Sequence, residues 1–258
     1  MLQSWPGIVH GGGLVAILDA GTRALGTRDE PRVIEARLTS SVPVATALML
    51  EGSAGAEGAV ITILQDGQTL TSASVRPSTT APGAAPPERE PRAGTALPTS
   101  DDCLACGIRN PLGLQQALRF DADGVWARLE PREPWRLDAA RAHAALAPVL
   151  LDEVAWWLGA LMMREGGLTN RIQVTLHASP LPARGPLFAA GRFADVTPVD
   201  RKRTFWRTAC ALFDEDGHTL AEAAIVFRGG PEWSARQMPY FKARTDAATF
   251  ARMFPNYV

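Results

Sequence analysis

The chain has 258 residues, 26 Lys and Arg against 27 Asp and Glu, and 46% hydrophobic residues. This composition is typical of a soluble globular protein and excludes a disordered chain or a disulfide scaffold. Because the charge is near neutral and no block of like charges occurs, we expect no nucleic-acid partner.

The cysteine content and the apolar runs indicate where the protein resides. Three cysteines form an odd and sparse set, which favours a reducing compartment, so we expect a cytoplasmic protein. Residues 1–18 lack Lys and Arg and contain Pro6, unlike a signal peptide. The longest strongly apolar run, 154–163, is shorter than the roughly 20 residues that span a membrane. We therefore expect no membrane segment.

The chain is predicted to contain two folded units joined by a linker. Residues 77–102 are dense in Pro, Ala, Gly, Ser and Thr and show no apolar period, as expected of a linker. They separate an N-terminal unit at 1–76 from a C-terminal unit at 103–229, and a polar tail follows at 230–258.

Each unit is predicted to place a helix before about four antiparallel strands. In the first unit an apolar helix follows His10, and strands are expected at 33–43 and 47–51. Residues 59–67 and 69–75 predict a hairpin, because an Asp-Gly pair separates two alternating runs. No hairpin precedes this helix, so the first strand of this unit is predicted to be missing or shortened.

The second unit repeats this order after an additional leading hairpin. Its predicted elements, with those of the tail, are a hairpin formed by 114–120 and 125–129, a helix after His143, strands at 172–180 and 187–193, a hairpin formed by 207–217 and 219–227, and a short helix at 246–253.

Two aspartates occupy equivalent positions in the predicted helices. His143 and Asp152 lie 133 positions after His10 and Asp19. Each aspartate lies in a helix that is apolar on nearly every side, where a carboxylate must be hydrogen-bonded, ion-paired or held neutral. Both are therefore site candidates. The alternative is that each one bonds a neighbouring loop amide or points out through a gap in the sheet.

Three glycines, residues 11–13, open the first helix. The first N–H groups of a helix lack an intrahelical acceptor and carry the positive end of the helix dipole, so they can bind an oxyanion. Glycines let a ligand approach this backbone closely. The alternative is that they only permit a tight turn.

The stretch HGGGLVAILDA at 10–20 resembles the His-Gly-Gly and Asp signature of hotdog-fold thioesterases of the PaaI-like type. LLDE at 150–153 and CLACGIRNPLGL at 103–114 resemble the same family, the latter its CxxCGxxNPxGL opening. The resemblance implies an α+β double hotdog, in which each unit is an antiparallel sheet wrapped around a central helix. The two units would form an internal pseudo-dimer, and the chain would pair again as a homodimer.

The resemblance also implies hydrolysis of acyl-CoA or acyl-carrier thioesters, with no cofactor beyond the CoA of the substrate. In the family the amide after the His polarises the carbonyl, and an acid on the other unit's helix activates water or attacks directly. The residues carried over are His10, Gly11, Gly12 and Asp152 for a first site, and His143, Ala144 and Asp19 for a second.

The two sites are not expected to be equal. Alanines 144 and 145 replace the glycines, and Pro148 predicts that the second helix begins near Ala147 or Pro148, which moves the donor amides away. We therefore expect the first site to be the working one. Glu153 is a rival to Asp152, because adjacent helix positions point about 100° apart.

Other candidate residues are open to two interpretations. Trp156 and Trp157 line an acyl pocket or pack in the core. The Cys103-x-x-Cys106 pair lacks two further zinc ligands in the sequence, so we expect no metal. The basic run at 201–203 contacts CoA phosphates or is a solvated loop.

Two functions remain besides thioester hydrolysis. The first is a non-catalytic hotdog protein that binds acyl-CoA or a similar apolar ligand. The second is a hotdog dehydratase or hydratase, a branch that uses a different Asp and His arrangement, which we do not find in the sequence.

Overall fold

The first unit follows the predicted order of elements. The computed structural model describes residues 2–27, 31–83 and 94–258. The predicted hairpin is formed, and its two loop residues, Asp66 and Gly67, have φ angles of 49° and 76°. Positive φ at both positions is what a two-residue type I′ hairpin requires. The elements are α1 (Gly11–Ala24), β1 (Arg32–Leu38), β2 (Met49–Gly55), β3 (Gly58–Gln65) and β4 (Gln68–Pro77).

The second unit surrounds a longer helix. This helix, α2 (Leu146–Met163), begins one or two residues earlier than predicted, and Pro148 lies in its first turn, where proline is tolerated. Before it come β5 (Thr95–Ala96), β6 (Leu118–Phe120), β7 (Gly124–Leu129) and β8 (Arg141–Ala142). After it come β9 (Gly167–Leu176), β10 (Leu181–Pro182), β11 (Leu187–Arg192), β12 (Thr197–Pro198), β13 (Phe205–Phe213) and β14 (Thr219–Gly229).

The predicted linker at 77–102 needs one correction. Thr95 and Ala96 form β5, which pairs with β6, so the end of this segment belongs to the sheet of the second unit. A strand of two residues is too short to produce an apolar period, so the sequence did not indicate it. Residues 84–93 lie outside the described residues.

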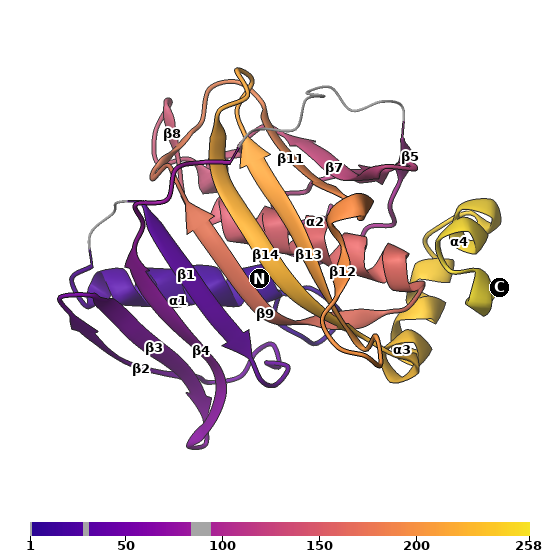
Figure 1. Ribbon diagram of the computed structural model, residues 1–258, viewed down its shortest axis with the longest axis horizontal. Helices are drawn as coiled ribbons and strands as arrows, with labels where there is room; N and C mark the ends of the chain where they lie inside the picture. Colours follow the sequence, from indigo (N-terminus) through magenta and orange to yellow (C-terminus); the bar gives the residue numbers. More distant parts are fainter. Residues whose placement is uncertain (1, 28–30, 84–93) are drawn as a thin grey trace.

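Strands of both units join in one antiparallel sheet, and β8 and β10 pair in a separate two-stranded sheet. In the described part of the chain the order is β2-β3-β4-β1-β9-β14-β13-β11-β7-β6-β5, and β12 pairs with β13. At its centre β1 pairs with β9, with Ile34 opposite Val174. These are the strands that follow the helix in each unit, so the two units meet through equivalent edges, as in a two-fold dimer (Figure 1).

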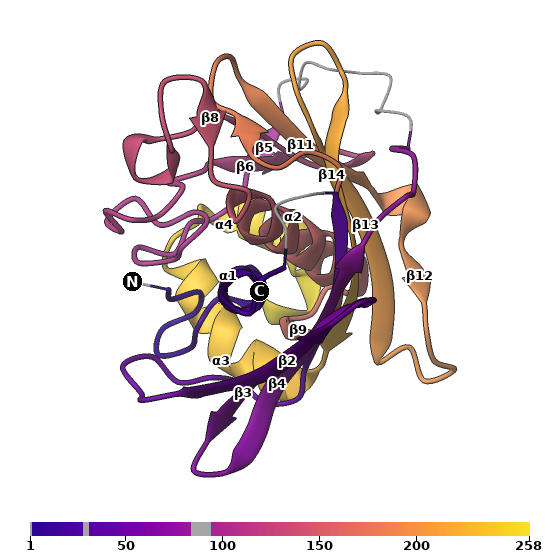
Figure 2. The same ribbon diagram turned by 90° about the vertical axis from the view of Figure 1, so that its left-hand side faces the viewer.

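The sheet curves around both helices, which lie against its concave face (Figure 2). Leu14, Val15 and Leu18 of α1 are buried, as is nearly every residue of α2. Burying one such leucine contributes roughly 1.5–3 kcal/mol. The helix α2 is long and apolar enough to cross a membrane, with a mean hydropathy of 1.4, yet 78% of it is buried inside the protein. Its burial is that of a core helix.

The tail contains one helix that was predicted and one that was not. The predicted helix is α4 (Ala247–Met253), capped by Asp246, whose Oδ1 accepts a hydrogen bond from Thr249 N at 2.9 Å. The additional helix is α3 (Pro231–Lys242), whose polar composition and internal Pro239 conceal it in the sequence. It packs at the end of α2, where the rings of Phe241 and Trp157 lie 5.2 Å apart.

Candidate active site

Glycines let the start of α1 touch α2. A Cβ atom at Gly12 would lie 2.1 Å from the carbonyl oxygen of Pro148. A Cβ atom at Gly11 would lie 2.7 Å from Oδ2 of Asp152. A side chain at Gly12 would meet the backbone of α2 and displace one helix, whereas one at Gly11 would displace the Asp152 carboxylate, so Gly12 in particular lets the N-terminus of α1 lie against the first turns of α2.

Asp152 lies at this contact and is held by three groups. Its Oδ2 accepts a hydrogen bond from Gly12 N at 2.7 Å, and its Oδ1 accepts one from the Thr169 hydroxyl, also at 2.7 Å. The Nδ1 atom of His10 lies 3.3 Å from Oδ2, without the alignment of a hydrogen bond. These partners come from α1, β9 and the residue before α1, so both units position this carboxylate.

Burial raises the pKa of the Asp152 carboxyl above its ordinary value, although His10, Thr169 and Gly12 act in the opposite direction. Desolvation disfavours the charged form of a carboxyl, whereas a positive neighbour and hydrogen-bond donors favour it. A carboxylate with a raised pKa is a stronger base than one in water.

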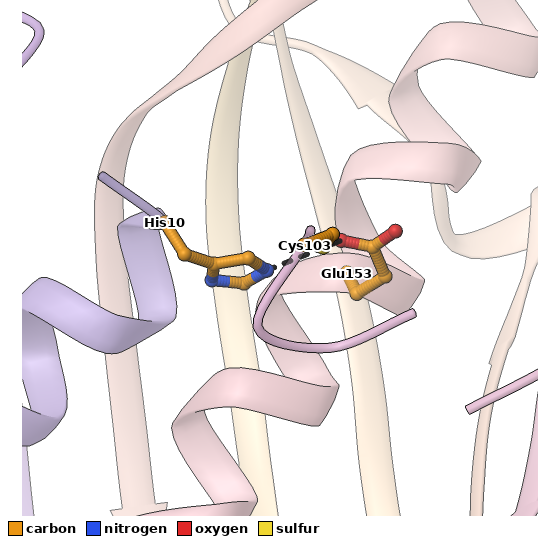
Figure 3. Close-up of side chains that lie close together, drawn as sticks. All are labelled: His10, Cys103 and Glu153. Carbon is orange, nitrogen blue, oxygen red and sulfur yellow. Dashed lines mark hydrogen bonds and ion pairs between the residues drawn. The ribbon is translucent and has the colours of Figure 1, made fainter. Parts of the chain in front are cut away.

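His10 lies between two acidic side chains, with Glu153 on its other side. Its Nε2 is 3.1 Å from Oε2 of Glu153, and Cys103 Sγ is 3.8 Å from the same oxygen (Figure 3). His10 and Cys103 are 1% and 2% exposed. The two adjacent acids thus face opposite nitrogens of one imidazole.

The pKa values of this group reflect burial opposed by contacts. Burial alone would lower the pKa of His10, but Cys103, Glu153 and Asp152 together raise it well above its usual value. Burial would raise the pKa of Glu153, yet its contact with His10 lowers it. For Cys103, burial is outweighed by Cys106 and His10, and its pKa is lowered to about 7. The hydrogen bond that the Cys106 thiol donates to Cys103, together with burial, raises the pKa of Cys106.

These side chains line a cavity of about 320 Å³. Its polar lining includes His10, Cys103, Cys106, Asp152 and Glu153. Its apolar lining includes Trp5, Ile8, Val9, Leu14, Trp156, Trp157, Trp233 and Phe241. Apolar walls with a few convergent polar groups are typical of a small-molecule site.

Both predicted tryptophans line the cavity and also pack in the core. Trp157 is 2% exposed, and its ring meets that of Trp156 edge-on at 4.9 Å. The indole N–H of Trp156 donates to the Gly167 carbonyl at 2.9 Å. The two roles that the sequence left open are therefore compatible.

The sequence did not single out the contribution of β9 and α3 to the site. Thr169 and Gln237 both line the cavity. The Gln237 amide brackets Gly167, accepting from its N–H at 2.9 Å and donating to its carbonyl at 3.1 Å. No motif marks these residues. The scattered aromatic residues of the otherwise polar tail were the feature of the sequence that could have indicated a role for α3.

The predicted second site has a different environment around Asp19. The two oxygens of Asp19 accept hydrogen bonds from Arg32 Nε at 2.7 Å and Arg32 Nη2 at 2.8 Å. Arg23 Nη2 lies 3.3 Å from Oδ2. The described cavity lining contains neither Asp19 nor His143 nor Ala144. Asp19 is thus ion-paired within the first unit, apart from this cavity.

Two other predicted roles are changed by the geometry. The Gly12 N–H already donates to Asp152, which leaves Gly11 N–H as the predicted oxyanion donor at the start of α1. The basic run at 201–203 is exposed between β12 and β13 and is not among the residues that line the cavity.

Comparisons with known proteins identify the fold. No protein-family model and no curated protein sequence matches this chain. A solved protein from Novosphingobium aromaticivorans with a provisional thioesterase name is 18% identical, with a TM-score of 0.63, covering 88% of this chain and 90% of its own. A hot dog protein of unknown function from Alicyclobacillus acidocaldarius is 18% identical, with a TM-score of 0.52 and coverages of 86% and 87%. The fold is a double hotdog.

Dehydratases share this double-hotdog architecture. The dehydratase domain of RzxB from Pseudomonas fluorescens is 23% identical to this chain, with a TM-score of 0.53, and the match covers 86% of each. The predicted α+β class and the pairing of two hotdog units in one chain are confirmed. At these identities the likeness concerns the fold and leaves the chemistry to the site.

Proposed function

We propose that this double-hotdog protein hydrolyses acyl thioesters, with the Asp152 carboxylate as its catalytic base or nucleophile. The observation that carries the proposal is the position of Asp152. It lies where the two units meet, held by Gly12 N and the Thr169 hydroxyl, and it lines a cavity with mostly apolar walls. The thioesterase name of a protein with the same fold supports the same reaction.

The helix end supplies the electrophilic half of the reaction. A thioester carbonyl oxygen next to Gly11 would accept a hydrogen bond from the Gly11 N–H, which lies at the positive end of the α1 dipole. Negative charge develops on this oxygen as the carbonyl carbon is attacked, so a donor fixed there stabilises the transition state more than the substrate.

Asp152 supplies the other half. As a base it takes a proton from water, whose oxygen attacks the carbonyl carbon, and the C–S bond then breaks to release the thiol. As a nucleophile it attacks the carbon itself, the C–S bond breaks, the departing thiolate takes a proton from water, and a second step hydrolyses the resulting anhydride with water. Single turnover in ¹⁸O-water followed by mass spectrometry of the protein tests the second route, because ¹⁸O enters Asp152 only when water attacks the aspartyl carbon of such an anhydride.

The cavity supports an acyl-CoA or acyl-carrier substrate. Trp5, Trp156 and Trp233 provide apolar surface for an acyl group. Arg228 also lines the cavity and is half-exposed, with its Nη2 atom 3.6 Å from Glu232, so it offers positive charge to a phosphate-bearing carrier. CoA is part of the substrate in this proposal and not a cofactor.

The test is release of free thiol from short, long and aromatic acyl-CoAs by wild-type protein and by Asp152→Ala. Hydrolysis that depends on Asp152 supports the proposal. Binding of acyl-CoA by both proteins without turnover by either would instead support a non-catalytic binding protein.

A dehydratase is the second candidate, and one contact favours it. His10 and Asp152 come from different units, and their Nδ1 and Oδ2 atoms lie 3.3 Å apart. Elimination of water needs one group to remove a proton and one to protonate the leaving hydroxyl, which such a pair can do. The sequence analysis placed both residues in the first site, but it did not assign them this role. Formation of an α,β-unsaturated product from a 3-hydroxyacyl thioester, without thiol release, would favour this candidate.

A further inference from the structure

In the CxxC loop that begins the second unit, backbone N–H groups point at the two cysteine sulfur atoms. Ala105 N and Cys106 N donate to Cys103 Sγ at 3.3 and 3.4 Å, and Ser100 N donates to Cys106 Sγ at 3.5 Å. A Cβ atom at Gly107 would lie 2.4 Å from the Cys103 carbonyl oxygen, so the loop needs a glycine there. N–H donors of this kind stabilise a thiolate, the form that binds metals.

Two further potential metal ligands, His10 and Glu153, lie next to this loop. The Nε2 atom of His10, a carboxylate oxygen of Glu153 and Cys103 Sγ all lie within 4.8 Å of one another. Figure 3 shows the three side chains directed toward a common point. His10 precedes α1 of the first unit, whereas Cys103 and Glu153 belong to the second, so the group bridges the two units.

The spacing of these atoms suits a tetrahedral metal ion. Zn–N, Zn–O and Zn–S bond lengths place neighbouring ligand atoms about 3.4–3.6 Å apart. Here Nε2 and Oε2 are 3.1 Å apart, and Sγ and Oε2 are 3.8 Å apart. Small rotations of the side chains would therefore bring all three to bonding distance of one ion.

The burial of negative groups also calls for a cation. Asp152 and Glu153 are 5% and 9% exposed, and their side chains flank the single imidazole of His10. One imidazolium compensates only one of two buried acids, and buried charges are paired or coordinate metals. In the described chain no Lys or Arg side chain has a hydrogen bond or ion pair with either acid.

We propose that His10, Cys103 and Glu153 bind one soft divalent transition-metal ion of the Zn²⁺ class at the boundary of the two hotdog units. The mixed N, S and O ligand set selects such an ion over Mg²⁺ or Ca²⁺. All three ligands line the cavity, so the fourth position is open to solvent or to a bound molecule.

The metal ion also gives Asp152 a second task. A histidine that binds a metal through one nitrogen commonly donates its other N–H to a carboxylate, which fixes the ring. Nδ1 of His10 faces Asp152 at 3.3 Å while Nε2 faces the proposed site. These two atoms are not aligned for a hydrogen bond here, so a rotation of the ring that aligns them would make Asp152 a positioning residue for the metal ligand His10, whether or not Asp152 takes part in thioester hydrolysis.

Cobalt titration tests the site without any substrate. Chelator-treated wild-type protein is titrated with Co²⁺, whose bond to a thiolate gives a charge-transfer absorption band, and Zn²⁺ is then added in competition with a chromophoric chelator. We expect one Co²⁺ per chain with the band, displaced by Zn²⁺. Wild-type protein without this band would overturn the proposal.

Matched variants locate the site. Cys103→Ser should lose the band and weaken Zn²⁺ binding by at least about 100-fold, since even a residue that supports a ligand contributes 10–100-fold. Cys210→Ser removes another buried free cysteine and should leave both unchanged. His218→Ala disrupts the exposed Asp214, Asp216 and His218 group and should also leave them unchanged. Loss of binding in either control but not in Cys103→Ser would overturn the assignment.

A second variant and a second readout cover a failure to fold. If circular dichroism shows that Cys103→Ser is unfolded, Glu153→Gln must weaken Zn²⁺ binding in its place. In wild-type protein, Zn²⁺ must also protect Cys103 from iodoacetamide, measured by mass spectrometry. Equal alkylation with and without Zn²⁺ would mean a reactive thiol without a metal. Because no substrate is used, these outcomes are independent of thioester hydrolysis.

Discussion

Asp19 and Asp152 occupy the same place in the two units but have different partners. In each unit a side chain from the strand after the helix holds the aspartate. For Asp19 this is Arg32 of β1, which donates two hydrogen bonds. For Asp152 it is Thr169 of β9, which donates one. A guanidinium engages both oxygens of Asp19, whereas a hydroxyl leaves Asp152 available to a neighbouring imidazole and to the cavity.

This difference separates a structural acid from a reactive one. A buried carboxylate with a bidentate arginine contributes to a rigid ion pair. A buried carboxylate with a hydroxyl and an amide has fewer compensating charges, and burial raises its pKa. One repeat thus retains the acid for packing, and the other presents it at a cavity.

The largest expected effect follows from replacing the Asp152 carboxylate with a neutral amide. Asp152→Asn should lower kcat for thioester hydrolysis by about 10²–10⁴-fold, the usual contribution of a general base. The amide oxygen can accept from Gly12 N while the amide N–H donates to the Thr169 hydroxyl oxygen, so thermal unfolding should change little. Steady-state thiol release is the measurement. If Asp152→Asn had the wild-type kcat, Asp152 would not be a reactive acid, and the distinction from Asp19 would be wrong.

The counterpart of that change in the first unit is the removal of the arginine. Arg32→Met leaves Asp19 buried beside Arg23 alone and should lower the free energy of unfolding by about 3–5 kcal/mol. Denaturant unfolding measures the loss. The rate per folded molecule should stay near wild type, since Arg32 does not line the cavity. If stability were unchanged, the ion pair would have no structural role.

Thr169→Val removes the hydroxyl that orients Asp152 while keeping the shape of the side chain. A hydrogen bond to a charged group contributes about 1.5–3 kcal/mol, so kcat should fall by roughly 10–100-fold. KM should change less, because the hydroxyl acts on Asp152. A rise in KM with unchanged kcat would instead assign Thr169 to substrate binding.

Gly12→Ala tests the contact between the helices. Its Cβ would meet the Pro148 carbonyl at 2.1 Å, so overpacking should cost about 1–3 kcal/mol of stability. Gly13→Ala is the matched control, because there a Cβ would meet no helix backbone, only the end of the Leu104 side chain at 3.0 Å and the His10 Cβ at an ordinary contact distance of 3.5 Å. Thermal unfolding of both variants provides the comparison. Equal losses would mean that helix contact does not explain the Gly12 requirement.

Much of the fold could be predicted from local signals. The Asp-Gly pair at 66–67 fixed a two-residue hairpin, and the proline at 148 placed the start of α2 within two residues. The helix α3 escaped prediction, because it is stabilised by packing of Phe241 on Trp157 and not by an apolar period of its own.

The sequence by itself determined the two repeats, their hairpins and helices, and the presence of one aspartate in each helix. These follow from turn chemistry and apolar periodicity, which act over a few residues. The family resemblance already placed Asp152 with Gly12, 140 residues away, but only the tertiary structure showed that Asp19 meets an arginine instead. It also brought His10 to Glu153 and Cys103. Contacts across such separations depend on the pairing of β1 with β9, which aligns the two units, and no local pattern encodes them.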